Sequence, residues 1–439
     1  ELETISKLKM EVFFALITFL VYSASAADPQ FMIGLGKADI TGPAAGVNMM
    51  GYAHPDQRTA GIHTRLYSRA FITCEINDQD NCNVFVSADI AMGCTAINLD
   101  VFEQLRALYG ERYNEKNVVL SGTHTHSGPG GYLQYLTFTF TSLGFVNDSH
   151  DAIVTGIVQS IANAHDNMVP GNVYVNRGDL FDSNMNRSPT AYLNNPEDEK
   201  SKYTGDTDTR MTVAKFVDEN DADLGLISWF AVHPVSMNNS NHLISSDNKG
   251  YASYLAEKEF GSGFVAAFPN SNQGDVSPNL DGPKCVDTGE PCEMETSTCN
   301  GRAQLCMASG PGKDMFESTQ IIGQNQYDKA KELYDAATDM MNSTIASIHQ
   351  FVDMSNYDVV LDENSTVKTC SPAMGYSFAG GTIDGPGFFT FNQDHHHVNV
   401  AIELMPTSFT FMFFSFVDTS KCYGQSVRET LRGVLSGIL

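Results

Sequence analysis

The sequence predicts an α/β protein, with one large domain of mixed β-sheet and flanking helices over about residues 30–390. Short apolar runs typical of strands alternate along the chain with longer segments of helical periodicity. The chain has 439 residues, of which 42% are hydrophobic, and this is enough to bury a sizeable core. Because neither an internal repeat nor a low-complexity linker interrupts it, we expect no domain boundary within that range.

The expected strands are short apolar or alternating runs that end at turn-forming residues. A loop at 42–51 follows the first strand, and a polar turn at 77–83 separates the second strand from the third. We expect strands at 31–39, 70–76, 84–88, 118–120, 172–177, 211–217 and 224–230.

The expected helices carry apolar residues three or four positions apart, so that one face of each helix is apolar. Ile97, Val101 and Leu105 show this spacing in the first of them. We expect helices at 95–109, 152–167, 251–260 and 326–348.

The charge of the chain is strongly acidic, with 52 acidic and 26 basic residues and a net charge of −26. Such a surface repels phosphate backbones, so we expect no nucleic-acid partner and no electrostatic docking on anionic lipid. Solubility is the simplest explanation of the charge. No sequence feature indicates an obligate protein partner.

The amino terminus has the pattern of a secretory signal. An apolar run at 12–21 is too short to span a bilayer and precedes small residues of the A-x-A type. We therefore expect a signal peptide at 10–27 that starts at Met10, with residues 1–9 as a non-native leader. The predicted location is secreted or lumenal, with a peripheral position at the outer membrane surface as a further alternative.

Sequons and cysteines fit an oxidising compartment. The sequence contains N-x-S/T sequons, of which Asn147, Asn342 and Asn364 are the glycosylation candidates. Nine cysteines predict disulfides with at least one thiol left over. Sequence spacing leaves the partners of five of them open: Cys74, Cys82, Cys94, Cys370 and Cys422.

Four cysteines spaced by seven residues lie in a stretch rich in glycine, proline, serine and threonine. This spacing favours a loop held by two disulfides. A structural zinc site is the alternative, although the stretch lacks a C-x-x-C pair. The four are Cys285, Cys292, Cys299 and Cys306.

Three polar clusters each follow an apolar strand, where α/β proteins place their ligand sites. The first, at 121–131, contains His124 and His126, which point the same way if the chain is extended there. They are candidates to bind one metal ion or one substrate group. The alternative is a polar loop, or core histidines with satisfied hydrogen bonds.

The other two clusters carry a third histidine and a serine. His233 ends an apolar strand that holds the only tryptophan, and a structural histidine is the alternative there. At 270–279, Gly274 and Pro278 bracket a turn that presents Ser277, and an ordinary turn is the alternative. No G-x-S-x-G motif surrounds this serine, so an α/β-hydrolase is excluded.

Six stretches resemble neutral ceramidases in their residues and in their order along the chain. The resemblance extends from residue 31 to about residue 391. The matching stretches are 34–43, 50–53, 122–131, 186–196, 272–279 and 375–387.

This resemblance implies a zinc-dependent amidase that splits ceramide, or a related N-acylsphingolipid, into a sphingoid base and a fatty acid. His124 and His233 match the family's zinc-binding histidines, and one Zn²⁺ ion is implied. His126 matches a histidine beside the metal, and Arg187 matches an arginine that contacts substrate. Ser277 matches the residue described as the nucleophile.

The resemblance also implies two interleaved disulfides, Cys285 with Cys299 and Cys292 with Cys306. Ceramide further requires an apolar mouth near the metal, with the membrane surface as the source of substrate. The aromatic segment 132–140 is a candidate rim that touches the membrane, and an interior strand is the alternative. If the segment is a rim, Phe138→Asp should reduce activity on membrane-embedded ceramide and spare a soluble short-chain analogue.

From residue 392 onward the sequence no longer follows the family pattern, so we expect a ceramidase-like domain at 28–391 and an unmatched tail at 392–439. The family completes its zinc site with a glutamate and a tyrosine, and ends with an immunoglobulin-like β domain that we expect to be absent here. Glu403 is not assigned as a ligand because nothing around it matches. The histidine run 395–397 fits a solvated tail better than a metal site.

Two hypotheses for function follow. In the first, the chain is a secreted ceramidase, or an incomplete version of an active one. In the second, it is an impaired or inactive relative that binds sphingolipid. The missing glutamate and tyrosine favour the second hypothesis for the sequence as written.

Overall fold

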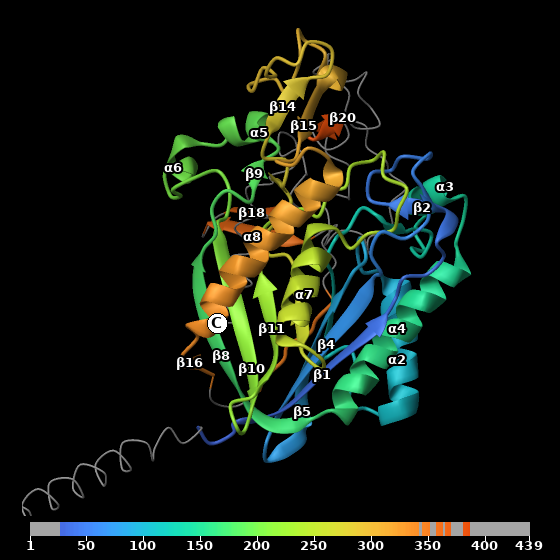
Figure 1. Cartoon of the computed structure of the whole chain (residues 1–439), viewed down its shortest axis with the longest axis vertical. Helices are drawn as coiled ribbons and strands as arrows, with labels where there is room; N and C mark the ends of the chain where they lie inside the picture. The colour runs from blue at the N-terminus through green and yellow to red at the C-terminus, as the bar shows by residue number, and fades with distance from the viewer. Residues whose placement is uncertain (1–26, 342–344, 352–356, 363–364, 370–380, 387–439) are drawn as a thin grey trace, which may run out of the picture.

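A computed structural model describes residues 27–341, 345–351, 357–362, 365–369 and 381–386 (Figure 1). Several predictions about the sequence lie outside these residues and stay predictions. They are the signal peptide at 10–27 except its last residue, the tail at 392–439, the sequons at Asn342 and Asn364, and Cys370 and Cys422.

One nine-stranded sheet organises the fold. β5 pairs with β6 in parallel, as does β11 with β12, whereas the other neighbours are antiparallel, so the predicted mixed α/β fold is confirmed. The strand order is β12 (Val265–Ala267), β11 (Asp223–Trp229), β10 (Arg210–Asp218), β8 (Val169–Asp179), β1 (Phe31–Asp39), β4 (Tyr67–Glu75), β5 (Asp78–Ala88) and β6 (Val118–Gly122), with β16 (Asp339–Met340) beside β8.

Helices cover the sheet in two groups (Figure 1). α4 lies on β1 and β4 with α2 against it, and α7 and α8 pack together against β10, β11 and β12. A Cβ atom on Gly36 would lie 2.2 Å from the Ser160 carbonyl oxygen, so only glycine lets α4 approach β1 so closely. The helices are α2 (Thr95–Tyr109), α3 (Leu136–Ser142), α4 (Asn147–Asp166), α5 (Pro189–Leu193), α6 (Glu197–Lys200), α7 (Asp247–Phe260), α8 (Met315–Asp335) and the 3₁₀ turn η1 (Ala303–Leu305).

The sheet folds back on itself, so its two ends approach each other. β12 packs against β1 and β4, although several strands separate them in the hydrogen-bonded order. Apolar side chains from six strands fill the space between the two halves, among them Phe71, Phe216 and Ile227. A Cβ atom on Gly225 would lie 2.3 Å from Leu35, which shows how closely the halves pack. This folding brings loops from opposite edges of the sheet together.

Short two- and three-stranded sheets lie outside the large sheet. They are β2 (Ala45–Met50) with β3 (Arg58–Ala60) and β7 (Gly128–Pro129); β9 (Met185–Asn186) with β13 (Val276–Ser277); β14 (Gly282–Cys285) with β15 (Cys306–Ser309); β17 (Asp358–Asp362) with β18 (Ser365–Lys368); and β19 (Gly381–Thr382) with β20 (Gly385–Pro386).

The prediction of a helix at 326–348 is wrong at both ends. α8 begins at Met315 because the Asp314 carboxylate accepts from the amide of Glu317, and the Glu317 side chain reaches back toward the cap. After Asp335 the chain instead forms β16, which pairs with β8.

The predicted turn at 77–83 and loop at 42–51 are also too long. β5 already begins at Asp78, which pairs with Glu75 in a tight β4–β5 hairpin. A disulfide between Cys74 and Cys82 crosses this hairpin. β2 occupies most of the predicted loop and buries its last two residues against β7.

The aromatic segment 132–140 is not an interior strand. Its first part is an irregular buried stretch, and α3 begins at Leu136. Phe140 on this helix is 76% exposed, whereas Phe138 packs partly against the core. Among the residues that the structure describes, no helix combines the length and apolar character needed to cross a bilayer.

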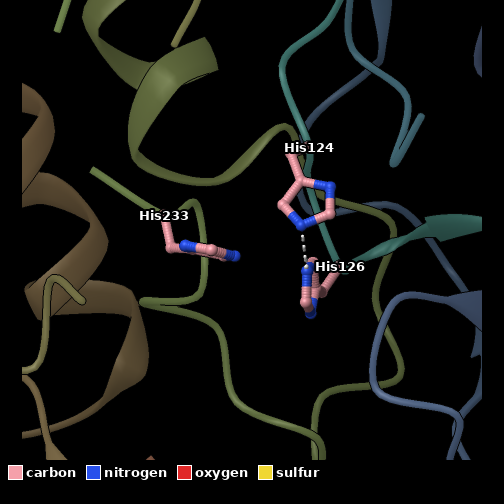
Figure 2. A group of neighbouring side chains, drawn as sticks. All are labelled: His124, His126 and His233. Atoms are coloured by element: carbon pink, nitrogen blue, oxygen red, sulfur yellow. Dashed lines mark hydrogen bonds between the residues drawn. The ribbon is translucent and has the colours of Figure 1, made fainter. Parts of the chain in front are cut away.

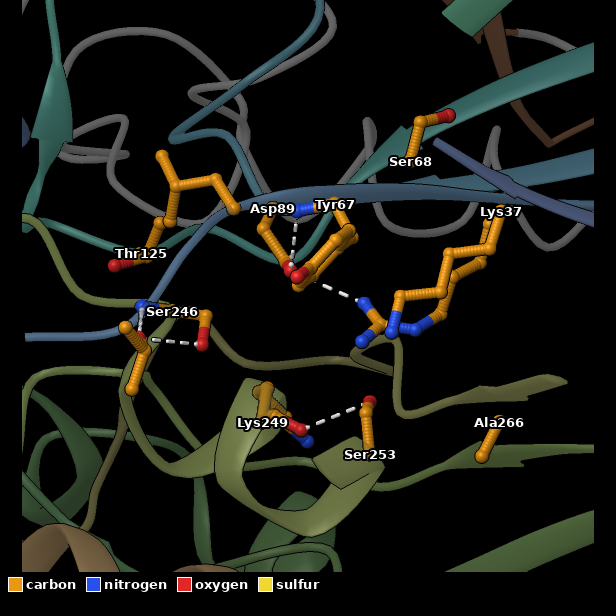
Figure 3. A network of polar contacts seen from close by, with 12 residues as sticks. Lys37, Tyr67, Ser68, Asp89, Thr125, Ser246, Lys249, Ser253 and Ala266 are labelled. Atoms are coloured by element: carbon orange, nitrogen blue, oxygen red, sulfur yellow. Dashed lines mark hydrogen bonds and ion pairs between the residues drawn. The ribbon is translucent and has the colours of Figure 1, made fainter. Parts of the chain in front are cut away.

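A buried ionic network (Figure 3) closes the interior between the two halves of the sheet, and it includes Glu257 near the C-terminal end of α7. Arg69 on β4 contacts the carboxylates of Asp89 (3.1 Å) and Glu257 (2.8 Å). Lys37 on β1 also contacts Glu257, and the backbone amide of Tyr67 donates to Asp89. Asp89 directly follows β5, so the network lies just behind the loop that bears the first histidine pair.

Candidate active site

The three polar clusters that follow strands come together at one place. Hydrogen bonds join them: Asn270, after β12, donates its side-chain amide to the Thr123 carbonyl oxygen at 2.6 Å, and the Gln273 carbonyl oxygen contacts His233 Nδ1 at 2.7 Å. The amide of Ser245 likewise donates to the carbonyl oxygen of Ser127. The folded sheet therefore assembles the histidines after β6 with the histidine after β11.

His124, His126 and His233 form a cluster of three imidazoles (Figure 2). Each offers one ring nitrogen, and these nitrogens lie within 4.8 Å of one another. The Nε2 atoms of His124 and His126 are 3.1 Å apart. The ring centroids of His124 and His233 are 4.9 Å apart, although more than a hundred residues separate them in sequence.

Backbone carbonyls fix the tautomer of two of these rings. His124 Nδ1 contacts the Ala91 oxygen, and His233 Nδ1 contacts the oxygens of Gln273 (2.7 Å) and Val276 (3.0 Å). Because a carbonyl oxygen only accepts, Nδ1 carries the proton in both rings and Nε2 keeps its lone pair. His233 and His124 thus present Nε2 lone pairs from rings that are held in place.

His126 is held differently. A Cβ atom on Gly51 would lie 2.3 Å from the His126 ring, and Gly51 has φ +133°, so glycine is needed where β2 ends. The ring of Tyr52 packs edge-on against His126 at 4.6 Å, and its hydroxyl donates to the Met237 oxygen. His126 Nδ1 is buried and has no hydrogen-bond partner among the described residues.

The backbone at His124 is strained. Its φ of +74° lies in the left-handed region, which non-glycine residues seldom adopt. Such strain persists where surrounding contacts enforce it and is typical of functional sites. The amide of His124 donates to the Ile90 oxygen, and that of Thr123 donates to the Ala88 oxygen, so the segment after β5 holds this conformation.

All three imidazoles are neutral at neutral pH. Burial lowers the pKa of His124 to about 4, and the positive charge of Arg187 adds to this effect. Burial also lowers the pKa of His126 and His233 well below the ordinary value, again with a contribution from Arg187. Neutral imidazole is the form that binds a transition metal, so protonation states and fixed tautomers fit a zinc site.

The first turn of α7 supports the segment that bears His233. The side-chain amide of Asn248 donates to the His233 oxygen and to the Ser236 hydroxyl, each at 3.1 Å. Lys249, fully buried, donates from Nζ to the Phe230 oxygen at 2.8 Å. These contacts hold the end of β11 on both sides of the histidine.

Ser277 and Arg187 lie in a second polar group that adjoins the histidines. Ser277 is on β13, which pairs with β9, and Arg187 directly follows β9. Ser277 is fully buried, and its hydroxyl donates to Asp384 at 2.5 Å. Arg187 donates to the Gly274 oxygen and contacts Asp384 at 3.7 Å. Val276, the neighbour of Ser277, is the residue whose oxygen anchors His233.

Two residues of this site had no role in the sequence-based expectations. Asp384 lies in the glycine-rich stretch at 375–387 that resembles ceramidases, where a lone acidic residue between glycines was the available signal. Tyr52 lies in the stretch at 50–53, and no sequence pattern connects it with His126.

The loop that holds the four evenly spaced cysteines, residues 285–306, packs against the segment that carries Asp384. The structure pairs Cys285 with Cys299 and Cys292 with Cys306, so the pairing that the resemblance implies is confirmed. The alternative of a structural zinc site at these cysteines is wrong. Ile383 is fully buried against this loop. Cys94 is a buried free thiol, and of the glycosylation candidates Asn147 begins α4 and is exposed.

Acidification is expected to destabilise the metal-free chain as the pH falls from about 6.5 to about 4. Histidines of the unfolded chain take up protons near pKa 6.5, whereas folded His124 does so only near 4. The unfolded state therefore binds more protons in this window, and the free energy of unfolding decreases. Thermal unfolding of chelator-treated chain measures this; an unchanged pH dependence in His124→Gln would contradict it.

A family model decides the relationship of this chain to known proteins. The model described as "Neutral/alkaline non-lysosomal ceramidase, N-terminal" matches residues 31–412. The chain belongs to this family. The match covers the strands and loops that build the histidine cluster and the Ser277 group.

Relatives in the ceramidase family are similar over most of this chain. Neutral ceramidase B of Dictyostelium discoideum is 50% identical, over 85% of this chain and 54% of the relative. Neutral ceramidase 2 of Arabidopsis thaliana is 45% identical, over 84% of this chain and 57% of the relative. The chain thus spans a little over half the length of these relatives.

Solved ceramidase structures share the fold. A structure titled "Ceramidase complexed with C2" superposes with a TM-score of 0.72 at 40% identity, covering 82% of this chain and 53% of that one. The neutral ceramidase of Pseudomonas aeruginosa gives a TM-score of 0.69 at 39% identity, covering 79% and 52%. Nothing in these comparisons favours the inactive relative over an enzyme.

Proposed function

We propose that this chain forms the zinc-binding part of an amidase that hydrolyses the N-acyl bond of ceramide. The observation that carries the proposal is the cluster of three neutral imidazoles beside Ser277 and Arg187, in a member of the ceramidase family. In the overall reaction, water adds its oxygen to the carbonyl carbon, the C–N bond breaks, and protons from water end on the amine. The products are a fatty acid and sphingosine.

His124 and His233 would hold the zinc ion through Nε2, with His126 beside it. The donor chemistry fits, because imidazole nitrogens suit zinc and carbonyl-anchored rings are typical of its ligands. When bound, zinc supplies a Lewis acid that polarises the amide carbonyl and lowers the barrier to attack.

The remaining groups of the site act on charge and geometry. Arg187 is only 11% exposed and keeps a fixed orientation through two bonds to the Gly274 oxygen. A guanidinium held in this way stabilises the negative charge that develops on the amide oxygen, without reorganisation during the reaction. His126 is neutral and its Nε2 faces His124, so it can stabilise the same oxygen by donating a hydrogen bond.

We also propose that the protein is secreted or lumenal. Three disulfides support this proposal, because such bonds persist in oxidising compartments and are rare in the cytosol. The exposed side chain of Asn147, the first residue of a sequon, is compatible with it.

Phe140→Asp is expected to lower activity on ceramide in vesicles by about tenfold and to spare a soluble short-chain analogue. Phe140 (76% exposed) and Leu143 (80%) form an apolar tip at α3, just after the histidine loop. We propose that this tip contacts the membrane that supplies ceramide. Leu108→Asp on α2, where the leucine is 59% exposed, is the matched control. Equal losses on both substrates would exclude the membrane contact.

The proposed function is tested with purified chain. Bound zinc is measured by elemental analysis, and fatty-acid release from ceramide is followed with chelator and after zinc is restored. The proposal expects about one zinc per chain and turnover that stops with chelator and returns with zinc. A chain that binds zinc but releases no fatty acid would contradict the amidase, and a chain that is indifferent to chelator would contradict the metal site.

A further inference from the structure

Asp384 contacts both Ser277 and Arg187, the two residues of the second polar group. Its Oδ1 atom accepts from the Ser277 hydroxyl at 2.5 Å and from the Asn279 side-chain amide at 2.8 Å. Its Oδ2 atom lies 3.7 Å from Arg187 Nη1 and has no hydrogen-bond partner among the described residues. One carboxylate therefore meets both the hydroxyl and the guanidinium.

The segment that carries Asp384 is held in place from several sides. The Ile383 amide donates to the Arg187 oxygen at 3.2 Å, and the Ile383 oxygen accepts from the Ala308 amide at 2.6 Å. The Ile383 side chain is fully buried against the disulfide-bonded loop. The hydroxyl of Thr382 accepts from the Asp384 amide at 3.2 Å, which completes the turn between β19 and β20.

These contacts fix the proton of the Ser277 hydroxyl. The backbone amide of Asn279 donates to Ser277 Oγ at 3.1 Å. The hydroxyl proton of Ser277 therefore points to the Asp384 carboxylate. The Ser277 oxygen is thereby oriented and made more electron-rich. The charge of Asp384 also compensates that of Arg187, which is 11% exposed.

We propose that Asp384 is a positioning residue of the active site, which orients the Ser277 hydroxyl and the Arg187 guanidinium for the reaction. The inference rests on the proposed function and adds a residue to it. Asp384 acts through its negative charge, so its shape alone is not sufficient. Its hydrogen bonds go to Ser277 and Asn279 and not to the proposed zinc ligands, so we expect bound zinc to be unchanged when it is replaced.

Two substitutions separate charge from shape. Asp384→Asn keeps the shape and removes the charge, whereas Asp384→Glu keeps the charge and adds a methylene that the packed turn must accommodate. We expect kcat to fall about 10–100-fold in Asp384→Asn, with KM within about threefold and bound zinc unchanged. We expect Asp384→Glu to retain more kcat than Asp384→Asn even though it is the less stable variant.

Activity and stability are measured on the same preparations, with zinc content and thermal unfolding beside kcat and KM. Asp281→Asn is the matched control, because Asp281 is an exposed carboxylate near the same loop that contacts Lys284 and Ser309. If kcat follows stability, so that Asp384→Asn is more active than Asp384→Glu, the inference is overturned. An active wild type with an equally active Asp384→Asn overturns the inference alone, whereas an inactive, zinc-loaded wild type overturns the proposed function and this inference with it.

Discussion

His233→Ala is expected to remove the bound zinc and to lower kcat/KM for ceramide by more than about a thousandfold. The Lewis acid contributes several kcal/mol to lowering the barrier, and each 1.36 kcal/mol corresponds to about tenfold in rate. His233 has the most firmly fixed ring in the cluster, with two carbonyl oxygens on Nδ1 and the Asn248 amide on its backbone oxygen. Alanine at this position leaves no donor atom that can replace Nε2.

The three histidines should differ in a way that tests their assigned roles. His124→Ala is expected to lose zinc as His233→Ala does, because both rings present Nε2 from a carbonyl-anchored tautomer. His126→Ala is expected to keep zinc and to lose only part of kcat, since its Nδ1 is unanchored. Zinc loss in His126→Ala would make this residue a third ligand instead.

A matched control separates loss of zinc from loss of fold. His242 is exposed and lies outside the cluster, and its ring contacts the backbone of Arg58. His242→Ala should retain zinc and activity. Full activity of His233→Ala after dialysis against chelator would contradict the proposed metal site.

Local sequence patterns predicted the elements that depend on local interactions. α2 has the bounds predicted for 95–109, because three buried residues at helical spacing define its inner face. The strands before the first two polar clusters were also predicted, although β6 continues to Gly122, two residues beyond its predicted end. α8 was misplaced because its first turn is polar and is fixed by the Asp314 cap, a signal that periodicity does not contain.

The assembly of the site depends on contacts that local patterns do not encode. β6 and β12 lie at opposite ends of the strand order, and only the folding of the sheet brings Thr123 to Asn270. Asp384 reaches Ser277 from more than a hundred residues away. The residues 122–131, 233 and 277 could be identified as candidates from sequence, whereas their mutual geometry required the tertiary structure.

The largest expected effect on stability is that of Arg69→Met, which should lower the free energy of unfolding by about 3–5 kcal/mol. Arg69 and Asp89 are 3% and 1% exposed, and Glu257 is 13% exposed. Methionine fills a similar volume but leaves the Asp89 carboxylate buried without its counterion. Lys37 can still compensate Glu257, so the cost falls mainly on Asp89.

Denaturant unfolding of wild type, Arg69→Met and a surface control measures this cost. Arg106 forms an exposed pair with Glu111, in which the side chains are 49% and 77% exposed, so Arg106→Met should cost less than about 1 kcal/mol. Adding Asp89→Leu to Arg69→Met should restore part of the loss, since it removes the uncompensated charge. Equal effects of Arg69→Met and Arg106→Met would show that the buried network contributes no more than a surface pair.

Arg69→Met should also weaken zinc binding, because the ionic network and the proposed metal site share a segment of backbone. Asp89 lies between the Ala88 oxygen, which holds the amide of Thr123, and the Ile90 oxygen, which holds the amide of His124. The oxygen of Ala91 fixes the His124 tautomer. If Asp89 moves when Arg69 is removed, the strained φ of His124 loses its support, and zinc affinity should fall about 10–100-fold, the range found for residues that orient metal ligands. Destabilisation with unchanged zinc affinity would mean that the network supports the fold and not the site.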